Sequence, residues 1–116
     1  EIESEIFMNF IKKQMHTDCI RHTQLTNKQI KRVAICGGSG SFLLQQAKNK
    51  KADIFISSDF KYHEFFDADK KIIIADIGHF ESEQFTKELI YDFLRKKFTK
   101  FAVQLSNVNT NPINYL

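Results

Sequence analysis

Along most of this chain, short apolar runs alternate with segments in which apolar residues recur at helical spacing. Three runs have the composition of strands: residues 32–36, 52–56 and 71–75. The segments that follow them have the helical pattern: residues 42–48, 60–66 and about 81–97. The runs show little apolar–polar alternation, which is typical of strands that are buried on both faces. The sequence therefore predicts an α/β fold, in which a mostly parallel or mixed sheet is covered by helices on both faces.

The helix predicted over residues 81–97 has the strongest pattern in the chain. Its apolar face carries Phe85, Leu89, Ile90, Phe93 and Leu94. Its first turn is acidic and its last turn is basic, which is the charge order that the helix dipole favours. We therefore expect one continuous helix in this region.

The two ends of the chain have weaker patterns. Residues 4–15 carry a helical apolar stripe, with Ser4 as the expected N-cap. Residues 17–30 are polar, with short strand-like pieces. Residues 101–105 are expected to form a final strand, and the tail over 107–116 is expected to be extended and held by contacts elsewhere.

Composition narrows the class of protein. The 116 residues, of which 42% are hydrophobic, are enough for one domain with one core. A net charge of +3 is too small, alone, to indicate nucleic-acid binding. The chain starts at Glu1, almost inside a predicted helix, so we expect a single domain over 1–116 that belongs to a longer protein.

The cysteines and the apolar runs indicate a compartment. Cys19 and Cys36 have neither the spacing of a zinc site nor the number that a disulfide framework needs. No apolar run approaches the roughly 20 residues that span a membrane. A reducing cytoplasm is therefore the expected location.

Three strand-to-helix junctions carry the residues with chemistry. These junctions are Gly37–Ser41, Ser57–His63 and Asp76–Glu83. Right-handed crossovers bring parallel strands up in the same direction, so all three junctions should meet at one edge of the sheet, where open α/β sheets bind ligands. The convergence of the three is a stronger argument than any one of them.

The glycine loop has two interpretations. Gly38, Ser39 and Gly40 place backbone N–H groups and a hydroxyl before a predicted helix, which suits an anionic substrate group. The loop lacks the Lys-Ser/Thr of a P-loop and the spacing of a dinucleotide fingerprint. The alternative is a tight turn that needs positive φ, and the sequence does not decide between the two.

The other two junctions each hold a pair of residues four positions apart. Asp59 and His63 are either a capping aspartate with a surface histidine or a pair that contacts substrate. His79 and Glu83 fall on one face of a helix if it begins at once, and imidazole with carboxylate suits Zn, Mn or Fe. The alternative is a turn histidine and a carboxylate that favours the helix dipole. Two ligands do not complete a metal site, so further ligands would come from outside the chain or from Asp59 and Asp76.

Four motifs in this order resemble the C-terminal part of the Nif-three-like family, whose members are often labelled GTP cyclohydrolase type-two homologues. The motifs lie at residues 33–41, 52–63, 76–83 and 110–113, and the resemblance covers nearly the whole chain from about Ile30. The resemblance implies two similar α/β halves around a dinuclear metal centre, and assembly into a toroidal hexamer. This chain would be the C-terminal half.

The resemblance also assigns residues. The histidine and glutamate of the family's G-H-x-x-x-E motif fall on His79 and Glu83, which implies that both ligate metal. The remaining ligands, a His-His pair and an aspartate, belong to the half that this chain lacks. Ser58 stands where the family usually has glycine, which puts a close backbone approach there in doubt.

The function expected from these residues is metal-dependent hydrolysis of a nucleotide-like or phosphorylated substrate, with two divalent ions. Asp59 and His63 would orient a ligand or take a proton, and Gly38, Ser39 and Gly40 would contact an anionic group. The alternative is a non-enzymatic, metal-stabilised scaffold that binds protein or, less well supported, DNA partners. A third interpretation is a simple anion-binding domain. On either of the first two, the chain alone is expected to be inactive.

Overall fold

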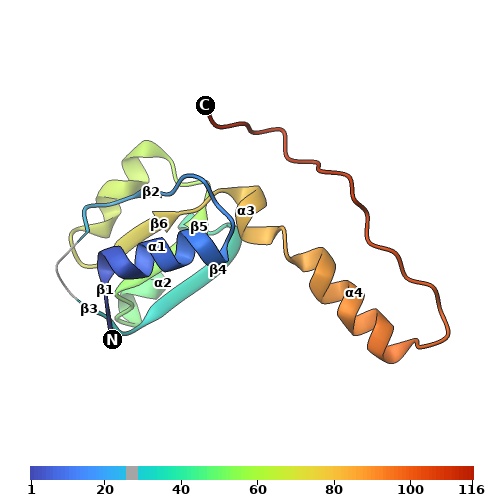
Figure 1. Cartoon of the computed structure of the whole chain (residues 1–116). Coiled ribbons are helices and arrows are strands. Elements are labelled where there is room, and N and C mark those ends of the chain that lie inside the picture. The colour runs from blue at the N-terminus through green and yellow to red at the C-terminus, as the bar shows by residue number, and fades with distance from the viewer. Residues whose placement is uncertain (26–28) are drawn as a thin grey trace.

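The structure is a computed structural model that describes residues 1–25 and 29–116. Its strands are β1 (Ile2–Glu3), β2 (Arg21–His22), β3 (Gln29–Ile30), β4 (Val33–Ser39), β5 (Ile54–Ser58) and β6 (Ile73–Asp76). Its helices are α1 (Ser4–Gln14), α2 (Leu44–Asn49), α3 (His79–Glu83) and α4 (Thr86–Lys97), with 3₁₀ helices η1 (Ser41–Leu43) and η2 (Tyr62–Ala68). The strand-like pieces expected over 17–30 appear as β2 and β3, apart from residues 26–28, which lie outside the described part (Figure 1).

One mixed sheet organises the chain. Its strand order is β2-β6-β5-β4, with β4, β5 and β6 parallel and β2 antiparallel to β6. A separate two-residue ladder joins β1 to β3. The mixed α/β fold predicted from the sequence is confirmed.

Helices cover both faces of this sheet. On one face, Met8 and Ile11 of α1 pack against the isoleucines of β5 and β6. On the other face, Leu44 and Ala47 of α2 pack with Phe55 and with residues of η2. Burial on both faces explains why β5 and β6 read as continuous apolar runs, and every residue of these two strands is buried.

Strand β4 differs from the buried strand that its sequence predicts. It is an edge strand, it continues to Ser39, and Ile35 is 72% exposed. The expectation of burial on both faces was wrong because, within the described chain, β4 has a neighbouring strand on one side only and Val33 and Ile35 are left exposed.

The helix expected over 81–97 is divided in two. Helix α3 ends at Glu83, and α4 begins at Thr86. Helix α4 has no buried residue, and Leu89 and Phe93 on its apolar face are 72% and 64% exposed. Figure 1 shows α4 projecting from the rest of the molecule. We call residues 1–83 the body and residues 85–105 the arm.

The end of the chain is extended, as expected, but residues 101–105 do not form the predicted strand. A strand requires a neighbour to pair with its backbone, and this segment has none in the described chain. The tail returns toward α3, and Lys87 Nζ donates a hydrogen bond to the Ser106 carbonyl at 3.2 Å.

Two smaller points concern helices. Ser4 is the first residue of α1 and not its N-cap, which is Glu3 without a side-chain cap. Within the described residues, no helix has the length and apolar content needed to cross a membrane.

Candidate metal centre

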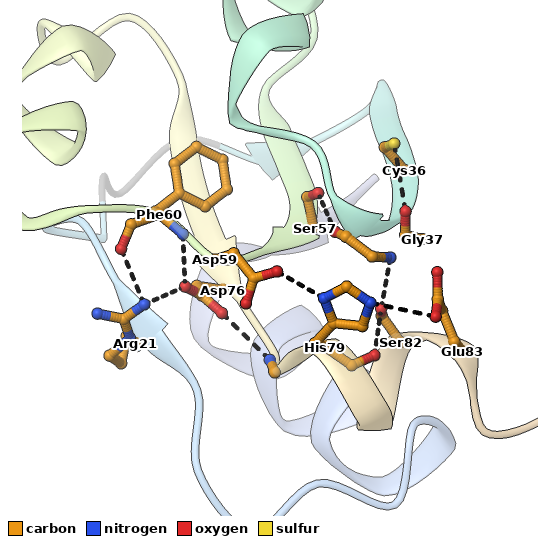
Figure 2. Close-up of polar contacts among 12 residues, drawn as sticks. Arg21, Cys36, Gly37, Ser57, Asp59, Phe60, Asp76, His79, Ser82 and Glu83 are labelled. Carbon is orange, nitrogen blue, oxygen red and sulfur yellow. Dashed lines mark hydrogen bonds and ion pairs between the residues drawn. The ribbon is translucent and has the colours of Figure 1, made fainter.

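The carboxyl ends of the three parallel strands meet, as the sequence predicts. Ser57, in β5, donates from its hydroxyl to the Gly38 carbonyl at 3.1 Å. The Gly38 N–H donates to Ser82 Oγ at 2.7 Å, and Ser82 Oγ donates to the His79 carbonyl at 2.8 Å. The ends of β4 and β5 are thereby tied to α3 (Figure 2).

His79 lies at the centre of this cluster. It is the first residue of α3, directly after Gly78, whose φ of +91° turns the chain. Its ring lies between two carboxylates, with Nδ1 2.5 Å from Asp59 Oδ2 and Nε2 3.3 Å from Glu83 Oε2 (Figure 2). The side chains of all three residues are about half exposed, at 44–51%, so this group faces solvent and is open to a ligand.

The two carboxylates change the acidity of the imidazole. The hydrogen bond to Asp59 raises the pKa of His79 above its ordinary value of 6.5, and Glu83 adds to this effect, while partial desolvation opposes it. Asp59 itself has a φ of +61°, an uncommon conformation for a residue with a side chain. The backbone thus holds the carboxylate against the ring at some conformational cost.

Gly38 leaves room beside this pair. Its φ is +65°, and a Cβ there would lie 2.5 Å from Glu83 Oε1 and 3.4 Å from His79 Nε2. A side chain at this position would collide with the glutamate. The glycine therefore keeps bare backbone next to the atoms that the sequence assigns to metal binding.

This donor set suits one part of a metal centre. When Nδ1 carries the proton that it shares with Asp59, Nε2 presents its lone pair beside the Glu83 carboxylate, which is the second-sphere arrangement usual for metal-binding histidines. Among the described residues, no group of three or more His, Cys, Asp or Glu side chains is arranged to hold a metal ion. The residues present therefore fit a partial site.

Asp76, considered above as a further ligand, is engaged elsewhere. Its buried carboxylate is paired with the Arg21 guanidinium and accepts hydrogen bonds from the N–H groups of Phe60 and Gly78, each at 3.1 Å. Arg21 also donates to the Phe60 carbonyl at 2.9 Å. Asp76 thus shapes the turns that carry Asp59 and His79, and its oxygens are not free for a metal.

His63 and the glycine loop are placed differently from the His79 group. His63 lies on η2 and is exposed, and its side chain forms no hydrogen bond with another described residue. In the loop, the Gly38 N–H is already donated to Ser82, and a Cβ at Gly40 would lie 2.2 Å from Ser57 Oγ. Ser39 is exposed. The loop is therefore shaped by close packing, and the structure brings Asp59, but not His63, to His79.

Several residues at this edge were not singled out from the sequence. Ser82 lies between His79 and Glu83 in the same segment, and its hydroxyl could have been noted there. Glu81 is 6% exposed and its Oε2 has no hydrogen-bond partner among the described residues. Burial raises the pKa of Tyr115, and the nearby Glu81 carboxylate raises it further. The carboxyl-terminal tail therefore reaches α3, which no local pattern shows.

Ser58 is the residue whose hydroxyl put a close backbone approach in doubt. Its side chain is fully buried in β5, and its Oγ has no hydrogen-bond partner among the described residues. The next residue, Asp59, still reaches His79 at 2.5 Å.

A cavity of about 630 Å³ adjoins the candidate ligands. His79 and Glu83 line one side of it, Ile90 of α4 lies along it, and residues 110–113 of the tail form the opposite wall. The fourth motif noted in the sequence thus lies next to the third. This position is compatible with contact between the tail and a bound ligand.

Known proteins are similar to this chain in sequence and in fold. Residues 1–112 match the family described as Duf34/NIF3 (NGG1p interacting factor 3). A Campylobacter jejuni protein named GTP cyclohydrolase 1 type 2 homolog is 35% identical over 113 residues, which are 96% of this chain and 44% of that protein. A Staphylococcus epidermidis protein of the same name is 34% identical over 113 residues, which are 94% of this chain and 31% of that protein.

Solved structures of related proteins have the same fold as this chain. Staphylococcus aureus protein SA1388 superposes with a TM-score of 0.83 at 30% identity, covering 99% of this chain and 39% of that one. A Bacillus cereus protein related to NIF3 gives 0.79 at 24% identity, covering 99% and 33%, which supports the fold. The chain spans only 31% to 44% of the length of the two curated relatives. The resemblance seen in the sequence is confirmed, and the chain belongs to the Duf34/NIF3 (NGG1p interacting factor 3) family.

Proposed function

We propose that this chain supplies one part of a dinuclear metal centre that hydrolyses a nucleotide-like or phosphorylated substrate. The observation that carries the proposal is the row of groups Asp59, His79 and Glu83 at the carboxyl ends of the strands, 2.5 Å and 3.3 Å apart. The name GTP cyclohydrolase 1 type 2 homolog, carried by relatives with 34–35% identity, suggests the substrate class.

Each residue has a defined part in this proposal. His79 would bind metal through Nε2 and Glu83 through its carboxylate, while Asp59 accepts the Nδ1 proton and fixes the ring. Bound divalent ions would supply Lewis acidity and activate water for hydrolysis. The cavity walled by residues 110–113 would take the organic part of the substrate, since its lining includes Phe80, Ile90 and Pro112. His63, exposed on η2, is a weaker candidate for proton transfer than Asp59.

The ligand assignment is tested by titrating the chain with Zn²⁺ alone and following histidine resonances by nuclear magnetic resonance. We expect the His79 signals to respond first. Glu83→Ala should weaken that response, whereas Glu88→Ala should not, because Glu88 is an exposed carboxylate on α4 away from His79. An equal Zn²⁺ response at His79 in Glu83→Ala and the unaltered chain would overturn the assignment.

The hydrolase proposal is tested on the protein expressed from its whole gene. Its metal content and GTP turnover should fall together in His79→Ala, and turnover should persist in His63→Ala if His63 takes no part in proton transfer. A metal-replete protein that is inactive on GTP and on a broad panel of nucleotides would instead favour the alternative, a metal-stabilised scaffold. The family description, which names an interacting factor, is the observation that keeps that alternative open.

A further inference from the structure

The anionic part of a phosphorylated substrate needs a place beside the candidate metal ligands, and the glycine loop offers little room for it. The Gly38 N–H already donates to Ser82 Oγ at 2.7 Å, so an anion there would have to displace a hydroxyl group. A Cβ at Gly40 would lie 2.2 Å from Ser57 Oγ, which shows how closely the loop packs on β5. The cavity of about 630 Å³ that adjoins the candidate ligands is the alternative place.

Lys87 brings a positive charge to this cavity. It lines the cavity from the first turn of α4. Its ammonium group donates a hydrogen bond to the Ser106 carbonyl in the tail at 3.2 Å, and among the described residues it forms no ion pair with a carboxylate. An ammonium group has three N–H donors, so the other two are left for a ligand.

The place of Lys87 in α4 strengthens the positive potential at the cavity. The first turn of a helix already carries a partial positive charge, which favours an anion and disfavours a cation. Glu88 is the acidic residue of this turn, but it does not line the cavity, and neighbouring residues of a helix do not face each other. The other charged side chains of the lining, His79 and Glu83, are the proposed metal ligands. Lys87 is therefore the charged group of this lining that remains for the substrate.

Asn111 adds a second donor to the same cavity. It is half-buried and lines the cavity from the tail. Its Oδ1 accepts the Ile113 N–H at 3.1 Å, so the amide group cannot turn around without losing that bond. The Nδ2 group at the other side of the amide forms no hydrogen bond with another described residue, and it is left to donate to a ligand.

The tail around Asn111 is held in shape by its own hydrogen bonds. The Asn111 N–H donates to Asn109 Oδ1 at 2.9 Å, and the Val108 N–H donates to Ser106 Oγ at 3.3 Å. Each of these bonds closes a local turn through a side chain. Because Lys87 also binds the Ser106 carbonyl, both donors are positioned before a ligand arrives, which lowers the entropic cost of binding.

The polar groups of the cavity thus fall into two kinds. His79 and Glu83 offer acceptors, which suit cations, whereas Lys87 and Asn111 offer donors, which suit an anion. Much of the remaining lining is apolar and includes Phe80, Ile90 and Pro112. A volume of about 630 Å³ lies in the usual range for small-molecule sites. The ligand that matches this lining has an organic part and an anionic group.

We propose that Lys87 and Asn111 hold the phosphate group of the substrate while its organic part lies against the apolar lining. This inference rests on the proposed function, and it narrows the substrate to a phosphate ester, to the exclusion of a neutral heterocycle. The ammonium group supplies charge, and the amide group supplies a hydrogen bond of fixed direction. Both residues bind and orient the substrate, and neither takes part in a chemical step.

Binding of GMP and of guanosine, which differ by one phosphate group, tests this proposal. Calorimetric titration of the metal-loaded protein, expressed from its whole gene, should show tighter binding of GMP. Lys87→Gln should weaken GMP binding by roughly three- to tenfold and leave guanosine binding unchanged, because it removes a charge-assisted hydrogen bond to phosphate. Lys96→Gln is the matched control: Lys96 is exposed on the same helix but does not line the cavity.

Asn111→Asp tests the second donor with little change in shape. Aspartate still accepts the Ile113 N–H, but it presents a negative oxygen where the amide group donated, so GMP affinity should fall at least as far as in Lys87→Gln. Asn109→Asp is the control, since it adds the same charge and still accepts the Asn111 N–H, but Asn109 does not line the cavity. Circular dichroism checks that all variants fold.

Three results would overturn the proposal. The first is that GMP binds no more tightly than guanosine, or that neither binds. The second is that each variant weakens GMP binding no more than its control. The third is that the preference for GMP is lost in His79→Ala but kept in Lys87→Gln, which would assign the phosphate to the metal ions alone. Turnover is measured separately: a preference that depends on Lys87 without hydrolysis supports this inference and contradicts the hydrolase proposal, and hydrolysis with an unchanged preference does the reverse.

Discussion

The body and the arm both contain periodic apolar residues, but these residues are buried in the body and exposed in the arm. In the body, the isoleucines of β5 and β6 are at most 6% exposed. In the arm, by contrast, Leu89, Ile90 and Phe93 of α4 are 53–72% exposed. Both segments have clear periodic patterns, so an amphipathic pattern specifies which face needs cover but not what covers it.

The largest expected effect compares one phenylalanine from each region. Phe55→Ala should lower the free energy of unfolding by about 3–5 kcal/mol, because Phe55 is 2% exposed and its loss leaves a cavity. Phe93→Ala should change it by about 0.5 kcal/mol or less, because Phe93 is 64% exposed. Urea unfolding at low protein concentration measures both. Similar losses for the two variants would show that the arm packs on the body in solution.

The second prediction concerns the joint between the strand ends and α3. Gly38→Ala should cost roughly 1–3 kcal/mol, because φ is +65° and the new Cβ would lie 2.5 Å from Glu83 Oε1. Gly37→Ala is the control: its Cβ would meet no described atom closer than 3.7 Å. Thermal unfolding compares the two variants. Equal destabilisation would mean that the contact between Gly38 and Glu83 is not tight.

A smaller effect separates two neighbouring serines of β5. Ser57→Ala should cost about 1 kcal/mol, because it removes the hydrogen bond to the Gly38 carbonyl. Ser58→Ala should be neutral or slightly stabilising, because the buried Ser58 hydroxyl has no partner among the described residues. Denaturant unfolding distinguishes them, and a larger loss for Ser58→Ala would reveal a partner for its hydroxyl.

The smallest effect is that of pH on the His79 pair. The folded pKa of His79 is raised, so the pair contributes stability that is present below pH 6.5 and lost as the pH rises through the raised pKa. Asp59→Asn should move the midpoint of the His79 titration to lower pH. Nuclear magnetic resonance on the metal-free protein measures this midpoint. Titration of His63, which is not in contact with Asp59, is the internal control. An unchanged His79 midpoint would argue against the hydrogen bond.

Much of the body could be predicted from sequence because its signals are local. The runs ending at Ile56 and Ala75 lie in buried strands, and strand direction alone brought Gly38, Asp59 and His79 to one edge. The pairing of Arg21 with Asp76 could not be predicted, since it joins residues 55 positions apart through an antiparallel strand of two residues.

The arm was predicted less well because its signals depend on partners. The pattern over 81–97 does not mark the break after Glu83, since Phe85 continues the apolar periodicity across it. The strand predicted at 101–105 rested on the residues of that segment alone, whereas a strand also requires the backbone groups of a neighbouring strand beside it. The apolar stripe of the helix was read correctly, but its exposure was not foreseen.

One buried carboxylate joins two turns that are far apart in the chain. Asp76 accepts hydrogen bonds from the N–H groups of Phe60 and Gly78, one at each of its two carboxylate oxygens, so a movement of this one side chain would release both turns. The two amides should therefore exchange with heavy water at a common rate, set by one opening event. A ligand that touches only His79 would then slow exchange at Phe60 as well, which makes the Phe60 amide a remote reporter of occupancy at the strand ends.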